Sequence, residues 1–119
     1  NGICDARSLA RFYAALIGPI EGLQLLSRET VDAAREVQVE GRDEVIFMKS
    51  RFGLGFMLPP MLSPSLPEGC FGHPGAGGSL GFAHPEKGLA FGYVMNQMHM
   101  GISGDARSSA LVEAVYSCL

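Results

Sequence analysis

The stretch that decides the fold is CFGHPGAGGSLGFAHPEKGLAFGYVMN, residues 70–96. It begins with an apolar pair, passes through a glycine-rich segment at 73–78 and returns to apolar residues. A Pro-Glu-Lys-Gly segment at 85–88 then favours a tight turn, because proline and glycine suit chain reversal. A nearly unbroken apolar run follows. The pattern predicts three strands joined by a glycine-rich connection and a hairpin, at about residues 70–74, 79–84 and 88–96.

Two helices are predicted upstream of this stretch. The first covers about residues 5–17, where the Asp5 carboxylate can accept the free N–H groups of the first turn. Its apolar side chains recur at three- and four-residue intervals and predict one buried face, formed by Leu9, Phe12, Tyr13 and Leu16. The second helix covers about residues 28–37, behind the N-cap Ser27.

The remaining elements are predicted as one strand and one helix. Residues 38–50 alternate charged and apolar residues and indicate a loop with partial strand character, whereas residues 51–58 indicate a strand. Four prolines exclude a sheet strand at 59–67, because proline cannot donate to a hydrogen-bonded ladder. A last helix is predicted at about 105–119, capped by Asp105 and buried along Leu111, Val115 and either Cys118 or Leu119. Together the elements predict an α+β fold, an antiparallel sheet packed against helices.

Composition excludes several classes of function. The 119 residues are 47% hydrophobic and 18% charged, as in a single globular domain with a core. A formal net charge of −3 without a basic stripe argues against nucleic acid as a partner. No apolar run is long enough to predict a membrane span.

The cysteines and histidines do not predict a metal or cofactor site. Cys4, Cys70 and Cys118 are widely spaced and include no Cys-x-x-Cys pair. They favour reduced, mostly buried thiols in a cytosolic or organellar compartment. Histidine spacing does not suit zinc either: His84 is expected as a solvated turn residue and His99 in a loop.

At residues 70–96 the chain resembles the serine beta-lactamase and penicillin-binding protein superfamily. Within it, the likeness is greatest to the branch of class C beta-lactamases, related esterases and D-aminopeptidases. Members carry a Lys-Thr-Gly or His-x-Gly triad on the strand bordering the active site, and His73-Pro74-Gly75 matches it. Residues 4–13 and 52–56 resemble the family's upstream helix and its aromatic-Gly-Leu-Gly-aromatic segment. The resemblance implies the C-terminal part of a beta-lactamase-like α/β domain.

The resemblance also implies catalytic and substrate-binding roles for residues of this strand. His73 stands at the basic position of the triad, and the Ala76 N–H would complete the oxyanion hole. Gly75, and with it Gly77, is expected to border the substrate, because glycine lets an acyl group lie against the strand. Histidine in place of lysine favours ester or peptide hydrolysis over beta-lactam cleavage, since its charge is not permanent.

The nucleophile and general base of that family are absent from this sequence. Ile46 and His84 stand three residues before the two lysines, so no Ser-x-x-Lys exists, and no tyrosine begins a Tyr-x-Asn. The chain also starts at Asn1 without an initiator methionine or a secretory leader. We therefore expect a C-terminal segment whose partner is the N-terminal part of the same domain. A small ester, amide or peptide would be the substrate of the whole, and self-association of the segment is possible.

Three other interpretations of the chain and its glycine-rich stretch remain open. The parent protein could be an inactive family member that serves as a scaffold or self-assembles. His73 could be a plain turn or edge-strand residue. The glycines of residues 75–81 could cradle a phosphate, but no Gly-Lys-Ser/Thr follows and the next segment indicates a strand rather than a helix.

Overall fold

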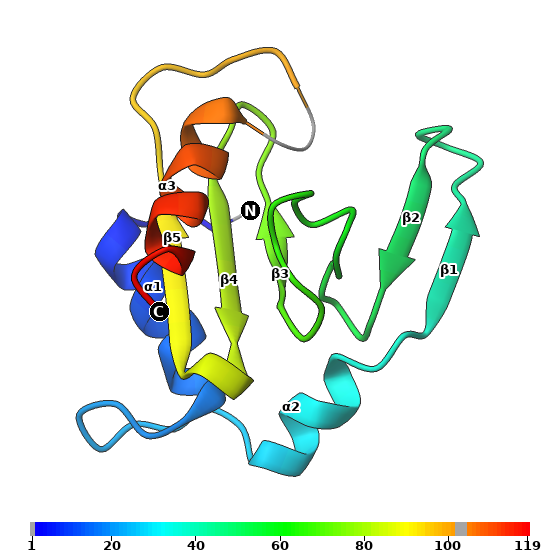
Figure 1. The fold of residues 1–119 in the computed structure, drawn as a ribbon. Helices are drawn as coiled ribbons and strands as arrows, with labels where there is room; N and C mark the ends of the chain where they lie inside the picture. The colour runs from blue at the N-terminus through cyan, green and yellow to red at the C-terminus, as the bar shows by residue number, and fades with distance from the viewer. Residues whose placement is uncertain (1, 102–104) are drawn as a thin grey trace.

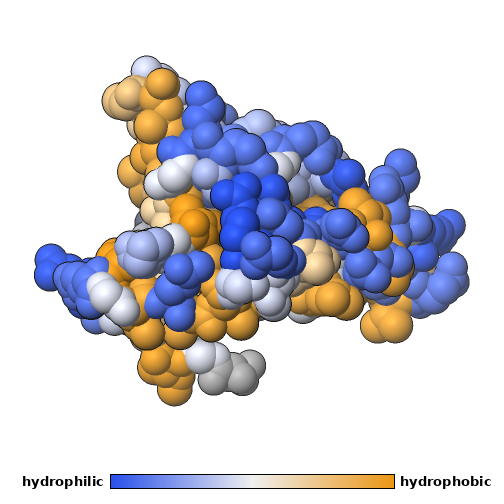
Figure 2. Space-filling model, turned by 90° about the horizontal axis from the view of Figure 1, so that it is seen from below, coloured by the Kyte–Doolittle hydropathy of each residue, from blue (hydrophilic) through white to orange (hydrophobic). Residues whose placement is uncertain are grey.

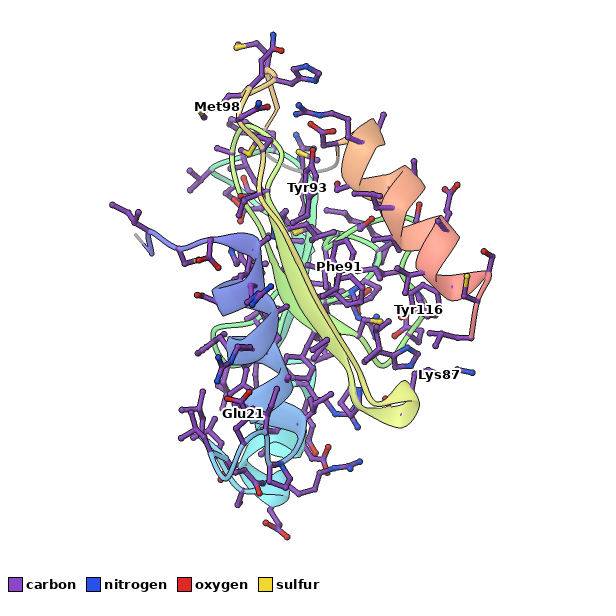
Figure 3. The ribbon with its side chains drawn as sticks, turned by 90° about the vertical axis from the view of Figure 1, so that its left-hand side faces the viewer. Glu21, Lys87, Phe91, Tyr93, Met98 and Tyr116 are labelled. Atoms are coloured by element: carbon purple, nitrogen blue, oxygen red, sulfur yellow. The ribbon has the colours of Figure 1, made fainter. Side chains whose placement is uncertain are left out.

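The structure, a computed structural model that describes residues 2–101 and 105–119, is built around a helix–sheet–helix sandwich (Figures 1 and 3). The central sheet contains β3 (Phe71–Pro74), β4 (Leu80–His84) and β5 (Leu89–Tyr93), in that spatial order and antiparallel throughout. Helix α1 (Ala6–Ile17) packs on one face of the sheet and α3 (Ala106–Tyr116) on the other. The predicted α+β class and antiparallel sheet are confirmed. Asn1 and residues 102–104 lie outside the described residues.

In the β4–β5 hairpin, aromatic residues and glycines lie on opposite faces of the sheet. Phe82 pairs with Phe91, and their ring centroids lie 5.2 Å apart on the α3 side. Gly81 pairs with Gly92 on the α1 side, where added Cβ atoms would lie 2.4 Å from the Tyr13 ring and 2.5 Å from the Ala6 carbonyl oxygen, respectively. The two glycines therefore let α1 lie directly on the sheet. The turn is a short 3-10 helix (Pro85–Lys87), closed by Gly88 at φ 60°.

Apolar side chains fill the space on both sides of the sheet. The core under α1 contains Tyr13, Leu16, Val31, Leu58, Phe71 and Ala83. The core under α3 contains Met57, Leu62, Leu66, Cys70, Leu80, Phe82 and Val112. Phe91 and Tyr116 project into this second core, between the sheet and α3 (Figure 3).

The predicted boundaries are wrong between the second helix and β3. A hairpin of β1 (Val39–Arg42) and β2 (Lys49–Phe52) occupies the region expected as a loop, and it projects away from the main sheet (Figure 1). The strand expected at 51–58 ends at Phe52. Gly53 then lies against the preceding helix, with a virtual Cβ 2.2 Å from the Ala34 carbonyl oxygen. The chain returns to the edge of β3 only through a single bridge from Met57 to Gly72.

Helix α2 (Arg28–Ala34) is shorter than the expected 28–37. In a longer helix, the Gln38 N–H would donate to the Ala34 carbonyl. Instead Gln38 donates to Phe52, and the Leu54 N–H takes the Ala34 carbonyl. Tertiary hydrogen bonds therefore end this helix three residues early.

The buried faces of the helices differ from the predicted ones. In α3 the buried residues are Ser108 and Val112, while Leu111 is 46% and Leu119 is 60% exposed. The Ser108 hydroxyl can face inward because it donates to the carbonyl of Asp105. In α1, Phe12 is exposed although Tyr13 and Leu16 are buried.

Strand β5 and the cysteines also depart from expectation. β5 ends at Tyr93 rather than 96, and its residues are only half-buried. Within the described residues β4 is its sole strand partner, which makes β5 an edge strand. Cys70 is buried, but Cys4 and Cys118 are exposed, so the expectation of mostly buried thiols is wrong.

Apolar residues reach the surface at separate places on the face seen from below, with polar residues between them (Figure 2). No helix within the described residues has the length and apolar character needed to cross a membrane. Among those same residues, no three His, Cys, Asp or Glu side chains gather as potential metal ligands.

Candidate functional site

The end of β3 presents His73 at the surface. Phe71 and Pro74 are buried, but His73 is exposed on the face of the sheet that α1 covers elsewhere. Its Nδ1 lies 2.6 Å from the carbonyl oxygen of Pro74. Tyr13 of α1 packs nearby and is buried, which raises the pKa of its hydroxyl to about 12 and keeps it protonated.

A tight glycine turn follows β3 directly. The Gly78 N–H donates to the Gly75 carbonyl at 3.0 Å, and the Gly75 N–H donates to the Ser79 carbonyl at 2.8 Å. Ala76 sits at the exposed corner of this turn. Among the described residues, no group accepts a hydrogen bond from the Ala76 N–H. The turn thus presents one free backbone donor, a few residues from the His73 side chain.

The two glycines expected to border a substrate have different surroundings. Gly75 is half-buried, and a Cβ there would lie 2.0 Å from the Ser79 hydroxyl oxygen. Gly77 is buried under Met98, whose methyl carbon would be 2.5 Å from an added Cβ. Met98 lies at the end of the sheet beside the turn (Figure 3). Gly77 is therefore closed off by its neighbours, and it shapes the turn at φ +94°.

A buried ion pair below the turn was missed from the sequence. Asp105 caps α3 and accepts hydrogen bonds from the Arg107 side chain at 2.8 and 2.6 Å. The Arg107 guanidinium holds the pKa of the Asp105 carboxyl well below its usual range. Because the two residues are only two positions apart, their sequence resembles an ordinary helix cap.

His84 is not the solvated turn residue that the sequence predicts. It is 6% exposed, and its Nδ1 lies 2.8 Å from the Tyr116 hydroxyl, which also contacts the Cys70 sulfur at 3.2 Å. Burial lowers the pKa of His84 and raises that of Cys70 to about 11. This cluster ties α3 to β4 and lies at the end of the β3–β4 hairpin opposite the glycine turn. His99 is exposed in the loop after β5, as predicted.

The structure therefore places His73, Gly75, Ala76 and Gly77 in one hairpin end, with an exposed base and a free amide on the same turn. An exposed backbone N–H held by a rigid turn can stabilise negative charge on a carbonyl oxygen. Within this hairpin no lysine stands three residues after a serine.

Comparisons with known proteins identify the family of this chain. The Beta-lactamase family model matches residues 1–115. The esterase/beta-lactamase LipL of Mycobacterium tuberculosis is 39% identical over 101 residues, which is 82% of this chain and 23% of LipL. The crystal structure of a family VIII carboxylesterase superposes with a TM-score of 0.88 at 38% identity, over 97% of this chain and 32% of that one. A penicillin-binding protein homologue from Caulobacter crescentus gives a TM-score of 0.88 at 37% identity, over 98% and 32%.

The fold and the hairpin are those of the beta-lactamase-like proteins, a class that includes esterases and penicillin-binding protein homologues among these relatives. The chain belongs to the Beta-lactamase family. It spans 23% of the length of LipL and 32% of each of the two crystallised relatives.

Proposed function

We propose that this chain supplies the active-site strand of a serine hydrolase that cleaves esters or peptides through an acyl-serine intermediate. The observation that supports it most is Ala76, an exposed residue in the turn after β3 whose N–H has no hydrogen-bond acceptor among the described residues. A serine from the rest of the parent protein would attack the substrate carbonyl. The Ala76 N–H would then donate to the oxygen as it becomes an oxyanion.

His73 would set the electrostatics of the same pocket. Its exposed imidazole would present a polar N–H near the negative charge that develops on the substrate. Gly75 precedes the donor, and because it has no side chain the Ser79 hydroxyl can close the turn beside it. The expected substrate is a small ester, amide or peptide, as the esterase relatives suggest.

Replacement of the donor amide tests this function. Ala76→Pro removes the N–H, and proline suits the second position of a tight turn, where its fixed φ is favourable. Ala76→Ser is the matched control, because it changes the side chain and keeps the N–H. Both variants are made in the protein that carries this chain together with a Ser-x-x-Lys segment, and initial rates on an activated ester are measured.

Loss of one oxyanion donor lowers kcat by about 100- to 1000-fold, and we expect this for Ala76→Pro with the melting temperature little changed. Ala76→Ser should stay within about threefold of the parent protein. Equal activity of the two variants would overturn the role of this amide. Absence of any hydrolysis by the folded parent protein, with no labelling by a serine-directed phosphonate, would support the inactive scaffold instead.

A further inference from the structure

The carboxylate of Asp105 is held more elaborately than a helix cap requires. Its side chain is only 4% exposed, and it accepts from the backbone N–H of Arg107 at 2.8 Å as well as from two guanidinium nitrogens. The other aspartate cap, Asp5 on α1, accepts only from the N–H of Ser8. A charge this buried is unfavourable unless it is fully paired, so the additional bonds call for an explanation.

Asp105 lies directly against the glycine turn. A Cβ built on Gly78 would sit 2.3 Å from the Asp105 Oδ2 and 3.1 Å from the Arg107 Nη2. Pro74, Gly78 and Asp105 also line one small cavity of about 10 Å³, roughly the space of one water molecule. The ion pair therefore supports one side of the turn without any intervening side chain.

Arg107 also fixes the segment that covers the other glycine. Its Nη1 donates to the carbonyl of Gln97 at 2.9 Å. Two residues later, the His99 N–H donates to the Gly77 carbonyl at 3.0 Å, and the Gly77 N–H donates to Gly101 at 3.2 Å. His99 reaches the carboxylate as well, with its Nδ1 3.8 Å from Asp105.

We propose that Asp105 and Arg107 are positioning residues that hold the Ala76 amide in the orientation needed for oxyanion stabilisation. This inference rests on the proposed hydrolase function. The Asp105 carboxylate packs directly against Gly78, and Arg107 binds the 97–101 segment that covers Gly77. The Gly78 N–H donates to the Gly75 carbonyl, which shares a peptide unit with the Ala76 N–H, so holding Gly78 in place fixes the direction of that N–H. Without the ion pair the turn stays connected, but the direction of its free N–H is no longer fixed.

The test separates capping from positioning. Asp105→Ser keeps a good N-cap and loses the paired contacts with the guanidinium. Asp5→Ser makes the same exchange at the cap of α1, where the carboxylate accepts from the Ser8 N–H, and is the matched control. Arg107→Lys keeps a charge but not the planar fork that reaches Asp105 and Gln97 together. All are assayed on an ester in the protein that carries a Ser-x-x-Lys segment.

We expect Asp105→Ser to lower kcat by about 10- to 100-fold, with KM within about threefold, because only the transition state carries the oxyanion. Arg107→Lys should show the same split. Asp5→Ser should leave kcat unchanged. The decisive readout is the double variant Asp105→Ser with Ala76→Pro, which should be no slower than Ala76→Pro alone, since the residue to be positioned is then gone.

Each result bears on one proposal or the other. If Ala76→Pro is slow while Asp105→Ser is as active as Asp5→Ser, the positioning role is refuted and the oxyanion role stands. Additive losses in the double variant would likewise refute positioning, because Asp105 would then act independently of the amide. If Ala76→Pro itself keeps full activity, the proposed function of the turn fails first.

Discussion

Gly92 offers the sharpest test of how helix α1 is seated on the sheet. It lies in β5 opposite Gly81, and an added Cβ would meet the Ala6 carbonyl oxygen at 2.5 Å and the Ala10 nitrogen at 2.7 Å. Both atoms are backbone, so neither can rotate away. In Gly92→Ala the helix must move from the strand by roughly 0.9 Å to restore an ordinary contact of 3.4 Å.

Two opposing effects determine how much Gly92→Ala changes the free energy of unfolding. Overpacking of a close contact costs about 1–3 kcal/mol. Replacement of glycine by alanine restricts the unfolded chain and returns about 0.4–1 kcal/mol. We therefore expect Gly92→Ala to lower the free energy of unfolding by about 1–2 kcal/mol. Gly81→Ala should cost less, because its Cβ would meet side-chain atoms of Tyr13 and Leu9, and these can turn aside.

Urea unfolding followed by circular dichroism measures the effect. With an m value of about 1–3 kcal/mol/M, the midpoint for Gly92→Ala should fall by about 0.5–1 M. Gly18→Ala is the control, since an added Cβ there meets nothing within 4 Å and the backbone is extended at φ 178°. The reasoning is refuted if Gly92→Ala unfolds at the same midpoint as Gly18→Ala, or if Gly81→Ala is the more damaging change.

Three further outcomes are expected. In the parent protein with a Ser-x-x-Lys segment, His73→Ala should lower kcat/KM on an ester by about 10- to 1000-fold without changing the melting temperature. Unchanged activity would mean that the strand contributes only the Ala76 amide to catalysis. Residues 1–119 alone should not turn over p-nitrophenyl acetate; saturable kinetics that survive repurification would contradict this. Burial lowers the pKa of His84, so protonation favours the unfolded state, and stability should fall as the pH drops below about 6.5. His84→Gln should flatten that dependence between pH 7 and 5, as measured by unfolding at each pH, and an unaltered slope would exclude His84 as its source.

The sheet could be predicted because its sequence is nearly symmetric about the Pro85–Lys87 turn. Gly81-Phe82 on one side and Phe91-Gly92 on the other appear in reverse order, as antiparallel pairing requires. The β1–β2 hairpin could not be found in this way. Its strands are short, and Glu40, Gly41 and Arg42 leave the first of them mostly exposed, so the alternation at residues 38–50 indicates only partial strand character.

The error in the buried face of α3 originates in polar residues that face inward. Ser108, Val112 and Tyr116 of α3 lie four residues apart, but only one of them is aliphatic, and the apolar spacing suggests a different face. Ser108 and Tyr116 are accommodated because each finds a hydrogen-bond partner.

Only the part of the candidate site that is contiguous in sequence could be predicted. The His73-Pro74-Gly75 triad and the Ala76 donor are contiguous, so a resemblance could assign them. The support from Asp105 and the cover over Gly77 join segments some 20 to 30 residues apart. Neither a motif nor a periodicity records such a contact.

The order of the elements along the chain has a consequence for synthesis on the ribosome. Helix α1 ends at Ile17, but the β4–β5 hairpin beneath it is not complete until Tyr93. At a synthesis rate of about 5–20 residues per second, roughly 4–15 s pass between completion of the helix and completion of the strands that cover it. During that interval Leu9, Tyr13 and Leu16 form an uncovered apolar stripe on the nascent chain. Slow codons between α1 and β5 would lengthen this exposure, and a holding chaperone that binds short apolar helices would protect the chain until β5 emerges.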